Sequence, residues 1–398
     1  MKEAYSNRLL ERVLSEVGLA SIEHLKLIDP FSGSGTTGVS AGDLVRARRL
    51  KSATVTALEV NPFLHLLSKA KMSGHSVHAF DVTKVAGELA RRAMSRRDGI
   101  APPPLLSTFS NPAYFAKEAL DDLGALKASF ASMSADGTTP PLWTLLRVAL
   151  AATVEPSSNL RRDGRALRLS PGKAASRPID TFLRTVQMIA DDLPKQRIEF
   201  NSNVLLADSR DASPELDKLN DLALFSPPYP NNIDYTEVYK LEGWFLDLYA
   251  DAADFSDQRR RSLRSHSSLR WGDTYRYRQE SQKLEVEELL RPIVETIPSD
   301  QYRKGREEVV LGYADDMFAS IKSMFALLRP GGRMAIVVGN SMHGKSGDDY
   351  VIASDLILAK LSQLAGFEVD RIEVARYPKR RTARSAYLRE SIVMARKE

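Results

Sequence analysis

The sequence predicts an α/β protein built on a mainly parallel, doubly wound sheet. Short apolar runs alternate with stretches of helical periodicity over residues 25–72, a rhythm that is typical of consecutive βαβ units. A turn rich in glycine follows the first apolar run. A later apolar run, residues 222–225, ends abruptly in two prolines. The glycine-rich turn and the two prolines both follow the carboxyl ends of expected strands, where open sheets of this kind hold their ligands.

Each element follows from its local pattern. We expect strands at residues 25–31 and 53–60, followed by helices at 37–50 and 63–72 respectively. The alternation resumes far along the chain, where we expect these elements: strands at 203–207 and 222–225, a helix at 314–328, a turn at 330–332, a strand at 333–338, a helix at 352–364, and strands at 368–374 and 391–395.

Two long segments interrupt this alternation. The first reads as helices and loops, and the second is strongly charged and lacks a steady period. We therefore predict one sheet domain made of residues 1–83, 200–250 and 306–398. A mainly helical insertion would occupy residues 84–199, and a basic, charged insertion residues 251–305.

Composition narrows the classes of function. The 398 residues are 43% hydrophobic and carry a formal net charge of +5, which suits a large core and permits a polyanionic partner. The chain has no cysteine, so disulfides, thiolate metal sites and cysteine nucleophiles are excluded, and a reducing cytoplasm is the expected location. We expect no signal peptide, no membrane span and no bound metal.

The most informative segment is Ser226-Pro227-Pro228-Tyr229, at the end of a buried apolar run. Neither proline can donate to a strand ladder, so the chain must leave the sheet stiffly at this point. The turn offers a hydroxyl, a proline carbonyl and an aromatic ring. These groups suit a flat ring that carries an exocyclic amino group.

A second segment, Asp29-Pro-Phe-Ser-Gly-Ser-Gly-Thr-Thr37, joins the first strand to the first helix. Gly33 and Gly35 allow a ligand to approach the backbone closely, next to the amides of a helix N-terminus. Glu59 ends the second strand, where an acid commonly binds ribose hydroxyls. An acid before the glycines, Asp29, favours a cationic cofactor such as S-adenosylmethionine (AdoMet) over a pyrophosphate.

These two segments resemble the cofactor and catalytic motifs of the amino-methylating DNA methyltransferases, which act on N4 of cytosine or N6 of adenine. The resemblance covers the sheet scaffold and implies a Rossmann-like class I methyltransferase fold that binds AdoMet. It implies that the methionine and ribose moieties are lined by Asp29, Phe31, Gly33, Gly35 and Thr36, with Glu59 on the ribose hydroxyls. For the acid near the cofactor's adenine, Asp208 is preferred and Asp81 stays open.

An exocyclic amine is a poor nucleophile because its lone pair is delocalised into the ring. We expect the Ser226 hydroxyl and the Pro227 carbonyl to accept its N–H groups, and Tyr229 to stack on a base flipped out of double-stranded DNA. Methyl transfer would be direct and in line. Methylation of cytosine C5 needs a cysteine and is excluded. Serine at the first position favours N4 of cytosine, with N6 of adenine as the alternative. An RNA methyltransferase and an inactive nucleic-acid-binding subunit are further alternatives.

Arginine-rich segments at 161–184, 259–278 and 376–389 are candidates for contacting DNA, and the alternative is that each is a solvated face. Residues 84–199 are the first candidate for target recognition and 251–305 the second.

After the Ser226 turn come four polar and aromatic residues that either border the pocket for the target base or begin a helix with core tyrosines: Asn231, Asp234, Tyr235 and Tyr239. A restriction-modification setting is expected, with partner restriction or defence proteins. The sequence does not indicate the oligomeric state.

Overall fold

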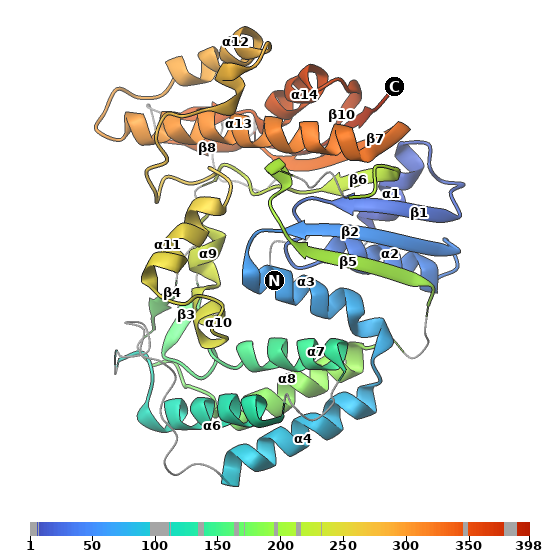
Figure 1. Ribbon diagram of the computed structural model, residues 1–398. Helices are drawn as coiled ribbons and strands as arrows, with labels where there is room; N and C mark the ends of the chain where they lie inside the picture. Colours follow the sequence, from blue (N-terminus) through green and yellow to red (C-terminus); the bar gives the residue numbers. More distant parts are fainter. Residues whose placement is uncertain are drawn as a thin grey trace. The chain divides into compact units, whose positions relative to one another are not determined.

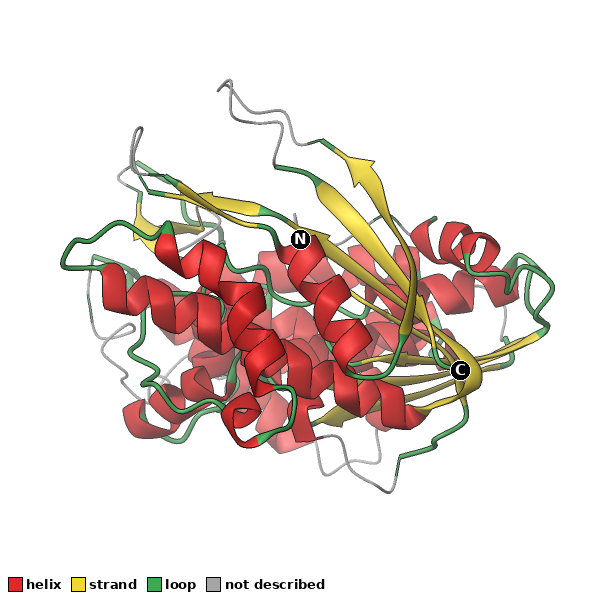
Figure 2. Ribbon diagram, turned by 90° about the horizontal axis from the view of Figure 1, so that it is seen from above, coloured by secondary structure: helices red, strands yellow, loops and turns green. Residues whose placement is uncertain are grey.

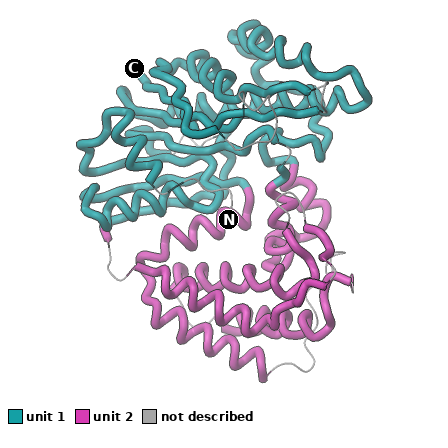
Figure 3. The backbone as a smooth tube through the Cα atoms, turned by 180° about the vertical axis from the view of Figure 1, so that it is seen from behind, with its two compact units in different colours: residues 1–60, 199–234, 260–398 teal, residues 61–198, 235–259 magenta. Residues whose placement is uncertain are grey.

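The chain forms two compact units, each assembled from segments that are distant in the sequence (Figures 1 and 3). Unit 1 comprises residues 1–60, 199–234 and 260–398, and unit 2 comprises residues 61–198 and 235–259. The computed structural model describes residues 6, 8–95, 111, 113–133, 139–162, 167–170, 172–194, 198–211, 216–231, 233–344, 349–377 and 388–398.

Unit 1 is built on a seven-stranded sheet with the strand order β10-β11-β7-β6-β1-β2-β5. Its strands are β1 (His24–Asp29), β2 (Ser52–Glu59), β5 (Phe200–Leu206), β6 (Asn220–Phe225), β7 (Leu328–Gly339), β10 (Glu368–Arg376) and β11 (Glu390–Arg396). The pairs are parallel except for those of β11, which runs antiparallel to both β7 and β10. The strands lie together as one layer, drawn in yellow in Figure 2. The predicted Rossmann-like, doubly wound fold is confirmed.

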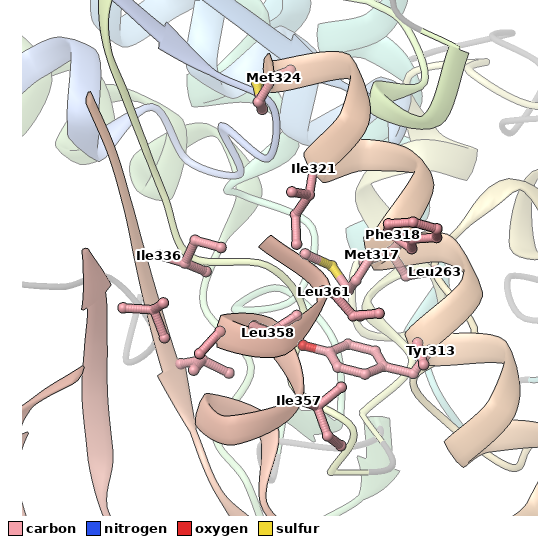
Figure 4. Close-up of a cluster of buried hydrophobic side chains, with 14 of the residues drawn as sticks. Leu263, Tyr313, Met317, Phe318, Ile321, Met324, Ile336, Ile357, Leu358 and Leu361 are labelled. Atoms are coloured by element: carbon pink, nitrogen blue, oxygen red, sulfur yellow. The ribbon is translucent and has the colours of Figure 1, made fainter. Parts of the chain in front are cut away.

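Burial explains which runs became central strands. Residues Leu222–Phe225 of β6 are fully inaccessible, as expected for a strand that is covered on both faces of a parallel sheet. Next to the sheet, side chains of α13 (Arg303–Leu327) and α14 (Ser354–Leu364) form a core with β7, including Tyr313, Phe318 and Ile336 (Figure 4). The other helices of unit 1 are α1 (Leu9–Glu16), α2 (Thr36–Arg46) and α12 (Lys283–Glu295).

Unit 2 is mainly helical. Its elements are α3 (Pro62–Ser73), α4 (Ala79–Ser95), α6 (Lys117–Met133), α7 (Pro140–Ala151), the β3–β4 hairpin (Leu160–Arg162 and Leu167–Leu169), α8 (Pro178–Asp192), α9 (Tyr235–Val238), α10 (Lys240–Phe245) and most of α11 (Ala252–Arg261). Its first segment begins at residue 61, whereas the sequence placed the start of the helical insertion at residue 84. The helix over 62–73 therefore belongs to this unit.

Two elements differ from their expected form. The predicted turn at Pro330–Gly332 lies within β7 as a bulge, because the register against β6 jumps from Asn220↔Leu328 to Leu222↔Arg333. Helix α13 begins at Arg303, well before the predicted start at residue 314. Before residue 314 the helix buries the charged Glu308, which hides the apolar period on which the prediction rested. Further along, it also buries Asp315 and Asp316.

These two aspartates hold a buried network of ion pairs. Arg264 Nη2 lies 2.8 Å from Asp316 Oδ1 and 2.5 Å from Asp315 Oδ2, and Arg210 Nη1 lies 3.0 Å from Asp316 Oδ1. Burial opposes the charge on Arg264, but its bonds to Asp316 and Asp315 outweigh burial and raise its pKa. The network ties α13 to the basic segment 259–278 and to the loop after β5.

We expect Asp316→Asn to lower the free energy of unfolding by about 3 kcal/mol, because it leaves two buried guanidinium groups short of a charged partner. The exposed ion pair between Arg276 and Asp211 provides a control of the same chemical type. Asp211→Asn should cost less than about 1 kcal/mol. Urea unfolding followed by circular dichroism measures both, and equal losses would contradict a structural role for the network.

Candidate functional site

The two sequence motifs meet at the carboxyl edge of the sheet in unit 1. Strand β1 pairs in parallel with β2 on one side and with β6 on the other. Because parallel strands end at the same edge, Asp29, Glu59 and Ser226 all lie there, at or just after the ends of three adjacent strands. The boundary between β1 and β6 is also the point where the strand order reverses, which is where doubly wound sheets bind ligands.

The loop after β1 is organised by Asp29. This carboxylate is 2% exposed, and its Oδ1 accepts a hydrogen bond from the Phe31 amide at 3.0 Å, while its Oδ2 accepts one from the Thr37 hydroxyl. Gly33 and Gly35 have φ angles of 50° and 79°, in the left-handed region that favours glycine. Gly35 is the residue just before helix α2, whose first residue is Thr36.

Glu59 supports the same loop from the end of β2. Its Oε2 accepts a hydrogen bond from the Gly33 amide at 2.8 Å, and its carbonyl accepts one from the Ala207 amide at 3.2 Å. The side chain is buried. The carboxylate expected to bind ribose hydroxyls thus also fixes the glycine turn. Among the described residues, a Cβ atom at Gly33 would meet only the Phe31 carbonyl oxygen, at 3.9 Å, which leaves space for a ligand above this glycine.

Burial disfavours the charge on Asp29. Burial raises the pKa of Asp29 to about 6, against the hydrogen bonds from Thr37 and Phe31, which act to lower it. A cationic group of a ligand would stabilise this carboxylate. Two buried carboxylates at neighbouring strand ends, beside an open glycine turn, fit a cofactor that carries an ammonium group and a ribose diol, as AdoMet does.

The turn after β6 is packed tightly against the rest of the sheet. The Ser226 hydroxyl donates to the Tyr229 hydroxyl at 3.3 Å, which in turn donates to Glu390 Oε1 at 3.1 Å. A Cβ atom at Gly339 would lie 3.0 Å from the Tyr229 ring, so this glycine lets the ring pack against β7. Pro227 is buried and Pro228 is half-buried.

The loop after β1 contacts the end of β6 through aromatic rings. The rings of Phe31 and Phe225 have centroids 5.7 Å apart, and Phe225 is fully buried immediately before Ser226. Sequence reasoning missed Glu390. The available signal was its place at the start of the last strand, because an antiparallel strand begins at the edge where its parallel neighbours end.

The two candidates for the acid near adenine lie in different places. Asp208 follows β5, the third strand of the sheet in chain order, and it accepts from Arg210 Nη2 at 2.6 Å. Asp81 lies in the first turn of α4, in unit 2. Only Asp208 therefore belongs to the same sheet edge as Asp29 and Glu59.

Many arginines of the basic segments have partners within the protein. Arg264 uses four of its five N–H groups on Asp315, Asp316 and the Thr274 carbonyl. In unit 2, Arg162 Nη2 lies 2.6 Å from the buried Glu242, and its guanidinium lies 5.2 Å from the ring of Tyr239. Tyr239 is itself buried, as expected for a core tyrosine. Lys379, Arg380, Arg381 and Arg384 of the third segment lie outside the described residues.

Among the residues that the structure describes, no group of three or more His, Asp or Glu side chains is placed to hold a metal ion. None of the described helices combines the length and the hydropathy that a membrane span requires.

The sheet is Rossmann-like and doubly wound, and both sequence motifs lie in loops at its carboxyl edge. Two similar proteins indicate which kind of enzyme this chain resembles. The chain is 23% identical over 93% of its length to the Type II methyltransferase M.BsoBI of Geobacillus stearothermophilus, and covers 78% of that protein. It is also 23% identical to the Type II methyltransferase M.AvaI of Nostoc sp., over 94% of this chain and 79% of that one. These matches bear out the predicted resemblance to the DNA methyltransferases.

Two other comparisons add nothing to this relationship. No protein-family model matches the chain. An rRNA methyltransferase, aviRa from Streptomyces viridochromogenes, aligns with 99% of this chain and 85% of its own at 11% identity. The TM-score of that alignment is 0.32, which is too low to carry an argument.

We expect Asp29→Asn to stabilise the free protein near neutral pH while weakening AdoMet binding. Because the folded pKa is raised, the contribution of Asp29 to stability is complete below its unfolded pKa and is lost as pH rises through about 6. The loss amounts to about 3 kcal/mol at neutral pH. An asparagine amide can satisfy both Phe31 and Thr37 without charge.

Thermal unfolding and AdoMet titration calorimetry across this pH range measure the two effects. Asp43→Asn, at an exposed position in α2, is the control. An Asp29→Asn variant that is less stable than the parent at neutral pH, or that binds AdoMet equally well, would contradict this assignment.

Proposed function

We propose that the protein methylates the exocyclic N4 of cytosine in DNA, using AdoMet as the methyl donor. The observation that carries the proposal is the shared sheet edge, where the Ser226 turn lies beside the loop of Asp29 and Glu59. The Type II methyltransferase relatives support DNA as the substrate. The family resemblance of the two motifs supports an amino nitrogen as the target.

Specific residues would hold the cofactor. Asp29 would bind the ammonium group and Glu59 the ribose hydroxyls, with Phe31, Gly33, Gly35 and Thr36 lining the site and Asp208 near the adenine. The raised pKa of Asp29 and the space above Gly33 support this arrangement. Bound AdoMet supplies a sulfonium methyl group that is electrophilic enough for direct displacement.

The Ser226 turn would hold the target base. The Ser226 hydroxyl and the Pro227 carbonyl would accept the N–H groups of the amine as its nitrogen becomes tetrahedral, and the rigid prolines preorganise both acceptors. Tyr229 would stack on a base that has left the duplex. Its ring is fixed by Gly339 and by Glu390, so little side-chain entropy remains to be lost when a base stacks on it.

Serine at the first position of the turn favours cytosine N4, and adenine N6 is the alternative. Both amines present N–H donors, so the chemistry of the turn suits either. Phosphate contacts would come from arginines of residues 84–199 and 251–305 that the protein does not itself bind. Arg161 and Arg184 are exposed examples in the first of these segments.

Incubating the protein with DNA and labelled AdoMet, followed by nucleoside mass spectrometry, tests the reaction. N4-methylcytosine is the expected product. N6-methyladenine would establish the alternative. Label on RNA, or on neither nucleic acid, would overturn the proposal.

We expect Ser226→Ala to lower the single-turnover rate about 10- to 1000-fold, since it removes one acceptor of the transition state. AdoMet affinity, measured by calorimetry, should change little. Ser73→Ala, at an exposed hydroxyl near the end of α3, is a matched control that should leave the rate unchanged. Loss of AdoMet binding in Ser226→Ala would show that the turn serves the cofactor instead of the base.

A further inference from the structure

The hydroxyl groups of the Ser226 turn form a directed chain that ends on a carboxylate. The chain runs from Ser226 to Tyr229 over 3.3 Å and from Tyr229 to Glu390 over 3.1 Å. Glu390 is anchored at its far side by Arg376, whose Nε lies 2.5 Å from Glu390 Oε2. The four residues come from the loop after β6, from β10 and from the first residue of β11.

The direction of this chain follows from what each group can donate. An ionised carboxylate only accepts, so the single proton of the Tyr229 hydroxyl must point to Glu390. The Tyr229 oxygen is then an acceptor, and the proton of Ser226 points to it. With its own proton engaged, Ser226 has only lone pairs left for a third partner. It can therefore accept from an exocyclic amino group and cannot donate to a carbonyl oxygen of a base.

We propose that Glu390, held by Arg376, is a positioning residue that orients Tyr229 and Ser226 toward an amino group, and that it receives the proton which this amino group loses. The inference rests on the function proposed above. It adds a residue outside both motifs, and it explains why the turn would select an exocyclic amine among the groups that bases present.

The protons and electrons of the step balance. The C–N bond forms from the nitrogen lone pair, while the C–S bond of the donor breaks and leaves its electron pair on sulfur. The nitrogen then carries a positive charge and loses one proton to Ser226. Ser226 passes its own proton to Tyr229, and Tyr229 passes its own to Glu390, which later returns a proton to solvent.

The surroundings of the chain favour this relay over ionisation of the tyrosine. Burial and the nearby charge of Glu390 raise the pKa of Tyr229 well above its ordinary value, so the phenol keeps its proton until it passes it on. Among the described residues, the charged or titratable groups in contact with Glu390 are Tyr229 and Arg376. The residue opposite Glu390 on β7 is Gly339, which carries no side chain.

The test is the pH dependence of single-turnover methyl transfer to DNA at saturating AdoMet. We expect the wild-type rate to fall at acid pH, because the relay ends on a proton acceptor. Glu390→Gln should lower the rate about 100-fold near neutral pH and flatten this acid limb. AdoMet affinity should not change.

The same pair of strands offers a matched control. Glu368 and Arg396 form an ion pair with the same 2.5 Å separation at the other end of the β10–β11 ladder, far in register from Arg376 and Glu390. Glu368→Gln should keep the wild-type rate and pH profile. Tyr229→Phe interrupts the relay while keeping the ring, and it should reproduce the flattened profile even if Glu390→Gln folds poorly.

The outcomes separate the inference from the function on which it rests. Wild-type methylation with unchanged profiles in Glu390→Gln and Tyr229→Phe would overturn only the inference. An equal loss of methyl-transfer rate in Glu390→Gln and Glu368→Gln would also overturn the inference, because it would reveal a general effect on β10 and β11. Absence of methyl transfer by the wild-type protein would overturn both.

Discussion

The parallel pairing of β1 with both β2 and β6 is the constraint on which the candidate site depends. It brings the ends of three strands to one edge, although β2 and β6 are separated in the chain by the whole first segment of unit 2. Every group assigned to the cofactor or to the target base extends from that edge. The antiparallel direction of β11 adds one more group, because its first residue, Glu390, reaches the edge from the opposite direction.

Buried charge serves two different purposes in unit 1. Asp316 is surrounded by arginines, so its negative charge is compensated within the protein and fixes α13 to its neighbours. Asp29 is held by an amide and a hydroxyl, which are both neutral. A buried carboxylate that is held by neutral groups lowers the stability of the free protein, and groups with such perturbed pKa values are concentrated at functional sites. The contrast distinguishes a buried charge that holds the fold from one that, as we propose, binds the cofactor.

The sequence predicted the sheet strands well because each is a short apolar run bounded by breakers, as β6 is by its prolines. It also placed both motif loops at strand ends. It could not reveal α13 before residue 314, because the buried Glu308 interrupts the apolar period there. Nor could it show that Asp315 and Asp316 occupy core positions, because the arginines that pair with them are distant in the chain. The role of Arg264 was hidden for the same reason, and a run of arginines read as a surface for DNA proved partly internal. The position of Glu390 at the sheet edge depends on the direction of β11, which no local sequence pattern encodes.

The interleaving of the two units also bears on how the chain folds. Strands β2 and β5 are neighbours in the sheet, yet residues 60–199 lie between them. Closing a loop costs conformational entropy that grows only with the logarithm of its length, about 0.6 kcal/mol for each doubling. An insertion of this size is therefore tolerated thermodynamically, and its penalty falls mainly on the rate at which distant strands find each other. The edge of the sheet next to β5 should accordingly be the part that assembles late, after the helices of unit 2 have shortened the distance to be closed.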